Sequence, residues 1–339
     1  MRFNWTKQLF VDLGSSYTKV SVPKHKTIIE QSCIAFFGET RTVVAFGKEA
    51  AAYFHLQEKE LQIAYPIQGG VVASPQAATL FLNTLLKRLD QQTGETGWWW
   101  RYGGRIAHPS DISPAQLHIL RRVMTESGLQ SLRLTPQSQA LAAYCRKEQT
   151  IANLFMCDIG ADTTELSVFI GPELLKSGTI PWGGKLVTEV VQKVVAQELD
   201  CEVTWQAAEE IKQTILDLSF ATTKTPSRSR DKKFSVKGKD TTTQLSKTVV
   251  VQSSLFDSSL SKLVRPLQDG IELFIDSLPA EVMAAIVNAG MRVSGGGALL
   301  QGTAAYLEQL LAIEAIKVAD PVIAVCQGLA LLDQGQTKN

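Results

Sequence analysis

The sequence predicts an α/β fold made of two related halves. Two stretches carry this prediction, residues 9–22 and residues 154–169. In each of them an apolar strand ends in an acid, a glycine turn follows, and a second strand returns directly. The matching residues stand at one constant offset and are Asp12 with Asp158, Gly14 with Gly160, and Thr18 with Thr164. A unit that occurs twice in one chain indicates two halves of similar structure.

Both turns have the chemistry of an anion site. Gly160 permits a positive φ, so the turn can present backbone N–H groups and the hydroxyls of Thr163 and Thr164 to an anion. Asp158 lies where the strand meets the turn, and its carboxylate can hold a cation that accompanies the anion. Two such turns facing each other would hold a polyphosphate and its metal from both sides. The structural alternative is a pair of plain hairpins.

The composition fits a cytoplasmic protein of two domains. The chain has 339 residues, of which 45% are hydrophobic and 20% charged, enough for two ordinary cores. A net charge of +1 gives no global field that would attract nucleic acid. The cysteines have no Cys-x-x-Cys spacing, and the histidines form no metal pattern. Because the sequence has neither a long apolar run nor the apolar core of a signal peptide, we expect no membrane span and no export.

The first half continues as short strands and helices. Apolar runs and turn residues predict strands at 32–37 and 42–46, a helix at 51–60, a turn at 65–72 and a helix at 77–89. Residues 113–116, Ser-Pro-Ala-Gln, begin the next helix, because serine caps it, proline suits its first position and glutamine completes a capping box. A strand at 132–134 follows, and Thr135-Pro136 begins an alanine-rich helix.

The second half returns to helices and strands after its glycine turn. We expect a long amphipathic helix from Gly183-Gly184, helices at 207–218 and 255–277, and a strand at 291–293. Residues 294–300, Ser-Gly-Gly-Gly-Ala-Leu-Leu, connect that strand to a further helix. The three glycines allow the backbone to approach a flat ligand, with a helix N-terminus facing it. A close-packed strand–helix turn would have the same sequence.

Residues 224–247 shift to Thr, Ser, Lys and Arg and predict a solvated hairpin with an exposed tip. A contact with phosphate or lipid is the alternative. The basic stretch is too short to indicate sequence-specific nucleic-acid binding.

Two aromatic segments are candidates for membrane contact. Phe3 and Trp5 stand beside basic residues in the first ten positions, where a short helix could form on a membrane surface. Trp98, Trp99 and Trp100 follow each other, and alternating side chains cannot all enter one core. Tryptophan beside arginine suits the bilayer interface. The alternatives are aromatic side chains that pack on the domain or contact another protein.

In order, and along nearly the whole chain, these motifs resemble the actin and sugar-kinase superfamily, which includes the heat-shock chaperone ATPases. Within it they resemble the MreB family of bacterial actins. The matching segments are Asp12–Thr18, Tyr65–Ala73, Asp158–Glu165, Gly183-Gly184, Ala208–Lys212, Gly295–Leu300 and Asp320–Gly328.

The resemblance implies an actin-like fold, with two ribonuclease H-like halves, a nucleotide cleft between them and a small inserted subdomain in each. The implied boundaries are 1–33, 66–144 and 320–339 for subdomain IA, 34–65 for IB, 145–182 and 255–319 for IIA, and 183–254 for IIB.

The resemblance also implies that ATP and Mg²⁺ bind between the halves. Asp12 and Asp158 would hold the metal, mostly through water. The residues implied to bind the nucleotide are Asp12, Gly14, Ser15, Ser16, Tyr17 and Thr18 in the first half, and Asp158, Gly160, Ala161, Asp162, Thr163, Thr164, Gly184, Glu209, Lys212, Gly295, Gly296, Gly297, Ala298 and Leu299 in the second.

By the same resemblance, the chain would polymerise with itself on the inner face of the plasma membrane and act in cell shape or wall synthesis. Cell-wall or membrane adaptor proteins are candidate partners. The family inserts a hydrophobic loop where this chain has Trp98–Trp100. A non-polymerising nucleotide-binding adaptor like FtsA or PilM is the alternative, and a small-molecule kinase is a third class.

Two departures from the family concern catalysis. Thr135 stands where the family has a glutamate that places the attacking water, and a neutral hydroxyl cannot act as a carboxylate base. Gln137 or Gln139 could orient water instead, if the register of the helix shifts. Ala161 and Asp162 replace glycines, and a carboxylate beside phosphates is repulsive unless it faces the metal or solvent. We therefore expect nucleotide binding with slow or weak hydrolysis.

Overall fold

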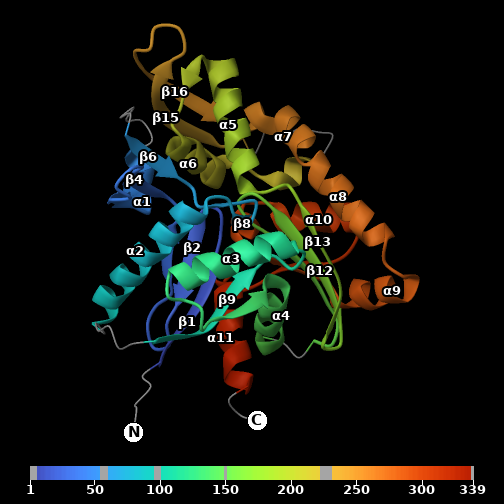
Figure 1. Ribbon diagram of the computed structural model, residues 1–339. Coiled ribbons are helices and arrows are strands. Elements are labelled where there is room, and N and C mark those ends of the chain that lie inside the picture. The colour runs from blue at the N-terminus through green and yellow to red at the C-terminus, as the bar shows by residue number, and fades with distance from the viewer. Residues whose placement is uncertain (1–5, 54–59, 95–100, 149–150, 222–230, 337–339) are drawn as a thin grey trace. The chain divides into compact units, whose positions relative to one another are not determined.

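The computed structural model describes residues 6–53, 60–94, 101–148, 151–221 and 231–336 (Figure 1). The chain forms two compact units. Unit 1 is Met1–Thr150 with Ile323–Asn339, and unit 2 is Ile151–Val322. The chain therefore leaves unit 1 once and returns to it for its last helix.

Unit 1 is built on a five-stranded sheet with the order β10-β9-β1-β2-β3. Its elements are β1 Thr6–Leu13, β2 Tyr17–Ser21, β3 Ile28–Gln31, β4 Ile34–Phe37, β5 Val43–Phe46, α1 Lys48–Ala52, β6 Leu61–Ala64, β7 Ile67–Gln68, β8 Val71–Val72, α2 Pro75–Thr93, β9 Arg101–His108, α3 Pro114–Glu126, β10 Arg133–Pro136, α4 Gln137–Glu148 and α11 Ala324–Gln336. Leu9 and Val11 of β1 belong to a core with Phe81 of α2 and Val123 of α3, while α11 packs on β1, β9 and α4.

Unit 2 is built on a five-stranded sheet with the order β13-β12-β11-β17-β18. Its elements are β11 Leu154–Ile159, β12 Thr164–Ile170, β13 Glu173–Ile180, α5 Gly184–Leu199, β14 Cys201–Glu202, α6 Trp205–Ile215, η2 Leu218–Ala221, β15 Lys233–Asp240, β16 Ser246–Gln252, η4 Ser253–Phe256, α7 Asp257–Leu263, α8 Arg265–Asp276, α9 Ala280–Ala289, β17 Met291–Ser294, η5 Gly296–Leu299, α10 Thr303–Leu311 and β18 Ala315–Lys317. All residues of the central strand β11 are buried, as expected for a strand covered on both faces.

The two sheets have the same plan, which confirms the two related halves predicted from the sequence. In unit 1, β1 is antiparallel to β2 and parallel to β9, with β3 and β10 continuing each side. In unit 2, β11 is antiparallel to β12 and parallel to β17, with β13 and β18 continuing each side. Asp12 and Asp158 are each the last but one residue of the central strand. The duplicated acid is therefore structurally equivalent in the two units.

Each unit also contains a smaller three-stranded sheet, β5-β4-β6 in unit 1 and β14-β15-β16 in unit 2. The hairpin expected within 224–247 is formed by β15 and β16, which pair antiparallel from Lys233 opposite Gln252 to Lys239 opposite Ser246. Residues 222–230 of that stretch lie outside the described part of the chain. The exact subdomain boundaries stay predictions.

The helix expected at 255–277 is interrupted. It consists of the short turn η4, α7 and α8, with the break at Val264. Pro266 explains the break, because proline has no N–H to donate within a helix and its ring meets the carbonyl four residues earlier. A proline is tolerated in the first turn of α8, where that N–H would have no partner inside the helix.

Two other boundaries differ from the prediction. Thr135 and Pro136 end the strand β10 instead of beginning a helix, because Thr135 pairs with Ala107 of β9. The short helix expected at 51–60 begins earlier, at Lys48, and residues 54–59 lie outside the described part. Among the described helices, none has both the length and the apolar character that a bilayer span requires.

Candidate functional site

The acid of unit 1 is buried and paired. Asp12 lies on β1 directly opposite Lys19 of β2, and Lys19 Nζ is 2.9 Å from Asp12 Oδ2. Only 6% of Asp12 is exposed. The ion pair compensates a buried charge that would otherwise be costly to desolvate. Any metal at Asp12 would share this carboxylate with Lys19.

Glycine is required at the first turn. A Cβ at Gly14 would lie 2.5 Å from Tyr17 O, closer than a side chain can come. Ser32, which precedes β4, holds the turn in place. Its Oγ donates to Gly14 O at 2.6 Å, and its N–H donates to Ser16 O at 2.9 Å. No local sequence pattern identified Ser32, because it reaches the turn only through the pairing of β2 with β3.

Ser15 connects the first turn to the β7–β8 hairpin. Its Oγ accepts a hydrogen bond from Gly70 N at 3.2 Å, and Ser15 itself is buried. The Tyr17 side chain, in contrast, is about half exposed. The first turn is therefore held by two distant segments of unit 1 and presents Tyr17 to solvent.

The second turn rests on the N-terminus of α5. Gly160 N donates to Thr163 O at 2.8 Å and closes the turn. Gly184 N then donates to Gly160 O at 3.0 Å, and Lys185 N donates to Ala161 O at 2.9 Å. Two N–H groups at the start of α5, which have no carbonyl partner within the helix, are thus satisfied by the turn. The position of the second turn is therefore coupled to α5.

The duplicated threonines hold the turns from inside. Thr18 and Thr164 are both fully buried. Thr18 Oγ1 lies 2.9 Å from Ser32 Oγ, and Thr164 Oγ1 donates to Trp182 O at 2.8 Å. Both hydroxyls therefore contact the protein. Their role toward a phosphate stays a prediction.

The carboxylate of Asp162 has a cation of its own. Its Oδ1 is 2.7 Å from Lys185 Nζ, on the first turn of α5. The sequence suggested that Asp162 would repel phosphates unless it faced the metal or solvent, and the ion pair with Lys185 offers a third arrangement. The negative charge of Asp162 is thus compensated within unit 2.

Glu209 and Lys212 form one network on α6 and α5. Lys212 Nζ is 2.7 Å from Glu209 Oε1 and donates to Gly184 O at 3.1 Å. Thr188 joins them, because Lys212 Nζ donates to its Oγ1 at 2.9 Å and its hydroxyl bonds Glu209 Oε1. Thr188 is fully buried and was not identified from the sequence. The network fixes α6 against the same end of α5 that receives the second turn.

The glycine segment packs against the second turn. Gly295 has φ of 81°, and a Cβ there would lie 2.2 Å from Ile159 O and 2.7 Å from Asp158 Oδ1. A Cβ at Gly297 would meet the Ile159 side chain at 2.1 Å. These two glycines are thus explained by close packing. Gly296 is open, and Ala298 is buried.

Leu299 ends this segment with its side chain 55% exposed, next to the open Gly296. An exposed leucine beside open backbone is the apolar surface that a nucleoside could cover. In unit 2, hydrogen bonds link the second turn to α5 and α5 to α6, and the glycine segment packs beside Asp158.

Thr135 is turned toward an arginine. Thr135 Oγ1 accepts a hydrogen bond from Arg105 Nη1 at 3.2 Å, and the residue is 1% exposed. Arg105 Nε is 3.5 Å from Asp333 Oδ1 of α11, and burial lowers the pKa of Arg105. Gln137 is the first residue of α4 and is half-buried. The hydroxyl at the position where the resemblance predicts a catalytic residue thus takes part in an interaction inside unit 1.

Cysteines flank both acids. Cys326 Sγ is 2.9 Å from Phe10 O, and burial, followed by the nearby Asp12 charge, raises the pKa of this thiol. Burial and Asp158 raise the pKa of Cys157 in the same way. Both therefore stay protonated thiols at neutral pH, and neither is a ready metal ligand.

The donor set fits Mg²⁺ in one respect. The described residues hold no group of three or more His, Cys, Asp or Glu side chains that could bind a metal alone. Asp12 in unit 1 and Asp158 in unit 2 each supply hard carboxylate oxygens, and Mg²⁺ commonly uses one or two carboxylates together with water and substrate phosphates. The chemistry of each carboxylate therefore suits a metal that a nucleotide brings better than a resident metal.

The membrane candidates Phe3, Trp5, Trp98, Trp99 and Trp100 lie outside the described residues. The strands that follow them are described. β1 and β9 pair in parallel from Thr6 opposite Arg101.

Comparisons with known proteins agree over nearly the whole chain. A family model described as MreB/Mbl protein matches residues 6–339. Cell shape-determining protein Mbl of Bacillus subtilis (strain 168) is 23% identical over 332 residues, covering 97% of this chain and 96% of that protein. Cell shape-determining protein MreB of Escherichia coli (strain K12) is 20% identical over 335 residues, covering 96% and 92%.

Three solved structures, two of MreB5 and one of MamK, have the same fold. MreB5 of Spiroplasma citri bound to ADP matches with a TM-score of 0.85 and 20% identity over 98% of both chains, and its AMPPNP complex also gives 0.85. The MamK double helical filament matches with a TM-score of 0.75 and 21% identity over 97% of this chain and 99% of that one.

Proposed function

Because this chain belongs to the MreB/Mbl protein family, we propose that it is an ATP-binding, actin-like cytoskeletal protein that polymerises into filaments on the inner face of the plasma membrane. Its actin-like fold is confirmed by the likeness to MreB5 and MamK. On the inner face of the plasma membrane, the filaments would serve as a scaffold for cell shape or wall synthesis.

Nucleotide binding is supported most directly by the equivalent positions of Asp12 and Asp158 in two sheets of the same plan. MreB5 has been crystallised with ADP and with AMPPNP. In this chain, the two glycine turns would hold the phosphates, Glu209 and Lys212 would approach the ribose or base, and Gly296 and Leu299 would lie under the nucleoside. Mg²⁺ would come with the phosphates.

Slow or weak hydrolysis is supported by Thr135. Its hydroxyl is bonded to Arg105 and nearly inaccessible. No carboxylate base stands at this position, so attack by water would lack general-base help.

Membrane contact is supported by the register of β1 and β9. Thr6 and Arg101, the residues that directly follow the two aromatic segments in the sequence, lie opposite each other in the sheet. The family's cell-shape role and the MamK filament favour this membrane-bound polymer over a non-polymerising adaptor.

The experiment is sedimentation and electron microscopy of the full chain with ATP and Mg²⁺, with and without liposomes of anionic phospholipid. We expect filaments that co-float with liposomes, and loss of flotation when all three residues of Trp98–Trp100 are changed to serine. A protein that stays monomeric under all conditions would reject the filament. Flotation that does not depend on the tryptophans would reject their role as anchor.

A further inference from the structure

We propose that the β15–β16 hairpin of one copy docks on α8 of a second copy through complementary charge. This inference rests on the proposed function, because it names a contact by which copies would associate. The basic hairpin face is defined here by Lys233, Lys237, Lys239 and Val250, and the acidic helix stripe by Asp269, Glu272, Leu273 and Asp276.

The basic hairpin face follows from strand alternation. Lys233, Lys237 and Lys239 of β15 are all exposed, while Val236 between them is buried toward α6. Side chains two residues apart share a face, so the three lysines point the same way. None of them makes an ion pair with a described residue.

The neighbours of the lysines on this face are mostly neutral. Their cross-strand partners on β16 are Gln252, Thr248 and Ser246. Val250 of β16 is 56% exposed on the same face. Acids lie near both ends of this row: Glu202 is the cross-strand neighbour of Lys239, and Asp231 interacts electrostatically with Lys233. The face is therefore a cationic strip with an apolar centre.

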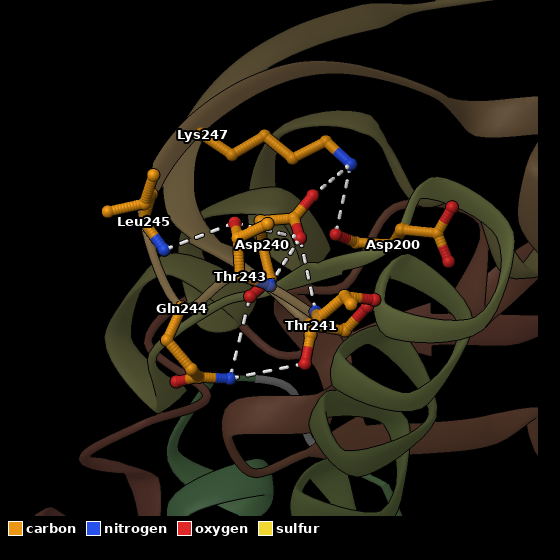
Figure 2. Close-up of polar contacts among 8 residues, drawn as sticks. Asp200, Asp240, Thr241, Thr243, Gln244, Leu245 and Lys247 are labelled. Carbon is orange, nitrogen blue, oxygen red and sulfur yellow. Dashed lines mark hydrogen bonds and ion pairs between the residues drawn. The ribbon is translucent and has the colours of Figure 1, made fainter.

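The tip of the hairpin is closed by a set of hydrogen bonds and an ion pair, as Figure 2 shows. Asp240 Oδ1 accepts hydrogen bonds from Thr242 N at 3.1 Å and Thr243 N at 2.9 Å. Lys247 Nζ is 3.1 Å from Asp240 Oδ2 and donates to Asp200 O at 3.0 Å. Because the lysines of β15 precede this closed turn, their spacing is fixed by a structured element.

The acidic helix stripe is a second exposed surface of unit 2. Asp269, Glu272 and Asp276 are all exposed on α8, and Leu273 among them is 72% exposed. Like charges three and four residues apart on a helix are mutually destabilising. None of these acids makes an ion pair with a described residue, and Glu272 accepts only from the amide of Gln268. A cationic partner would relieve this repulsion.

The charges match in spacing. Lys237 and Lys239 are two strand residues apart, roughly 7 Å. Glu272 and Asp276 are four helix residues apart, roughly 6 Å along the axis. Val250 and Leu273 are the exposed apolar residues beside these pairs. Two ion pairs and one apolar contact can therefore form together.

Charge complementarity makes a second copy the occupant that we propose. β15 packs on α6, whereas α8 packs on β12 and β13, and Figure 1 shows the hairpin and α8 at different sides of unit 2. The two surfaces cannot meet within one chain, but every chain carries both. A contact between unlike surfaces of identical copies is heterologous, and it adds copies without limit when its rotation does not close.

The test uses two charge-reversal variants of the full chain, Lys237→Glu with Lys239→Glu, and Glu272→Lys with Asp276→Lys. Each variant alone presents like charges at the contact, so we expect its critical concentration for sedimentation with ATP and Mg²⁺ to rise at least about tenfold. An equimolar mixture restores opposite charges at every contact, and we expect it to sediment within about twofold of wild type.

The matched control is Lys24→Glu with Lys26→Glu, which reverses two exposed lysines of unit 1 and should sediment like wild type. Circular dichroism and AMPPNP binding check that each variant is folded. If wild type sediments and either variant sediments equally well, the proposed contact between the hairpin and α8 is wrong. The contact is also wrong if the mixture of the two variants stays soluble. In both cases the proposal that the protein forms filaments is unaffected. If wild type itself does not sediment, the proposed filament fails first.

Discussion

At the scale of the residue, Thr135 is part of a buried polar network in unit 1. Its hydroxyl accepts a hydrogen bond from buried Arg105, which in turn pairs with Asp333 of α11. The position therefore has a structural role that a threonine fulfils well. A catalytic role would require a group that can hold water.

We expect Thr135→Glu to raise phosphate release about tenfold, because a carboxylate can act as general base. Arg105 would pair with the new carboxylate and limit the gain. Thr135→Val should leave phosphate release unchanged and lower the free energy of unfolding by about 1–2 kcal/mol, since Arg105 loses an acceptor. A phosphate-release assay measures the turnover, and urea denaturation measures the free energy of unfolding. A fall in turnover with valine would contradict the structural role.

Lys185 and Asp162 make a second prediction at this scale. We expect Lys185→Ala to weaken ADP affinity about tenfold, or about 1.4 kcal/mol, because Asp162 would then face the phosphates without compensation. Asp162→Ala in addition should recover most of the loss. Calorimetric titration measures the affinity. Adenosine, which has no phosphate, is the control ligand, and wild-type ADP affinity in the single variant would refute the arrangement.

At the scale of the element, the start of unit 1's central strand is held by a buried charge network. Lys7 of β1 has a side chain only 2% exposed, and its Nζ is 3.0 Å from Asp90 Oδ1 and 2.7 Å from Thr93 Oγ1 of α2. Tyr102 of β9 donates to the same Asp90 carboxylate, at 3.0 Å from its Oδ2. Burial and the Asp90 charge raise the pKa of Tyr102, so its hydroxyl stays protonated. The network ties α2 to both strands.

We expect Asp90→Asn to lower the free energy of unfolding by about 3 kcal/mol, because it leaves the Lys7 ammonium buried without its counter-charge. The control is Glu126→Gln, which breaks the exposed ion pair with Arg122 on α3 and should cost less than about 0.5 kcal/mol. Urea denaturation followed by circular dichroism compares the two. If both variants lose the same free energy of unfolding, the network around Asp90 contributes no more stability than an exposed ion pair.

The elements also show where sequence reasoning succeeds and where it stops. Ser113 caps α3 and accepts from Gln116 N as predicted, because a cap depends on neighbours in sequence. Ser32 and Thr188 act on their targets through strand pairing and helix packing, and nothing local marks them. Pro266 did carry a local signal, and the unbroken helix predicted through it was wrong.

At the scale of the whole molecule, the duplication was predictable because two turns repeat one pattern at one offset. The two sheets confirm it with equal strand order and direction. The pairing of Asp162 with Lys185 was not predictable, since it depends on how the second turn meets α5. The partition of the chain into four subdomains and the joint binding of a nucleotide by both units stay predictions.

Hydrogen exchange tests joint binding. With AMPPNP and Mg²⁺, we expect slower amide exchange in peptides covering both 13–18 and 160–164, because a triphosphate held by both turns would shield both. Adenosine should slow exchange only in unit 2, around Glu209 and the glycine segment. Protection of one turn alone by AMPPNP would mean that the units do not bind the nucleotide together.

The discontinuity of unit 1 has a consequence for biosynthesis. α11 packs on β1, β9 and α4, and its Asp333 is the counter-charge of Arg105, yet it is made after all of unit 2. During translation, the sequence of unit 2 is complete first, while the parts of β1, β9 and α4 that α11 covers stay exposed. A nascent chain stalled before residue 324 would expose these parts and be a natural target for chaperones.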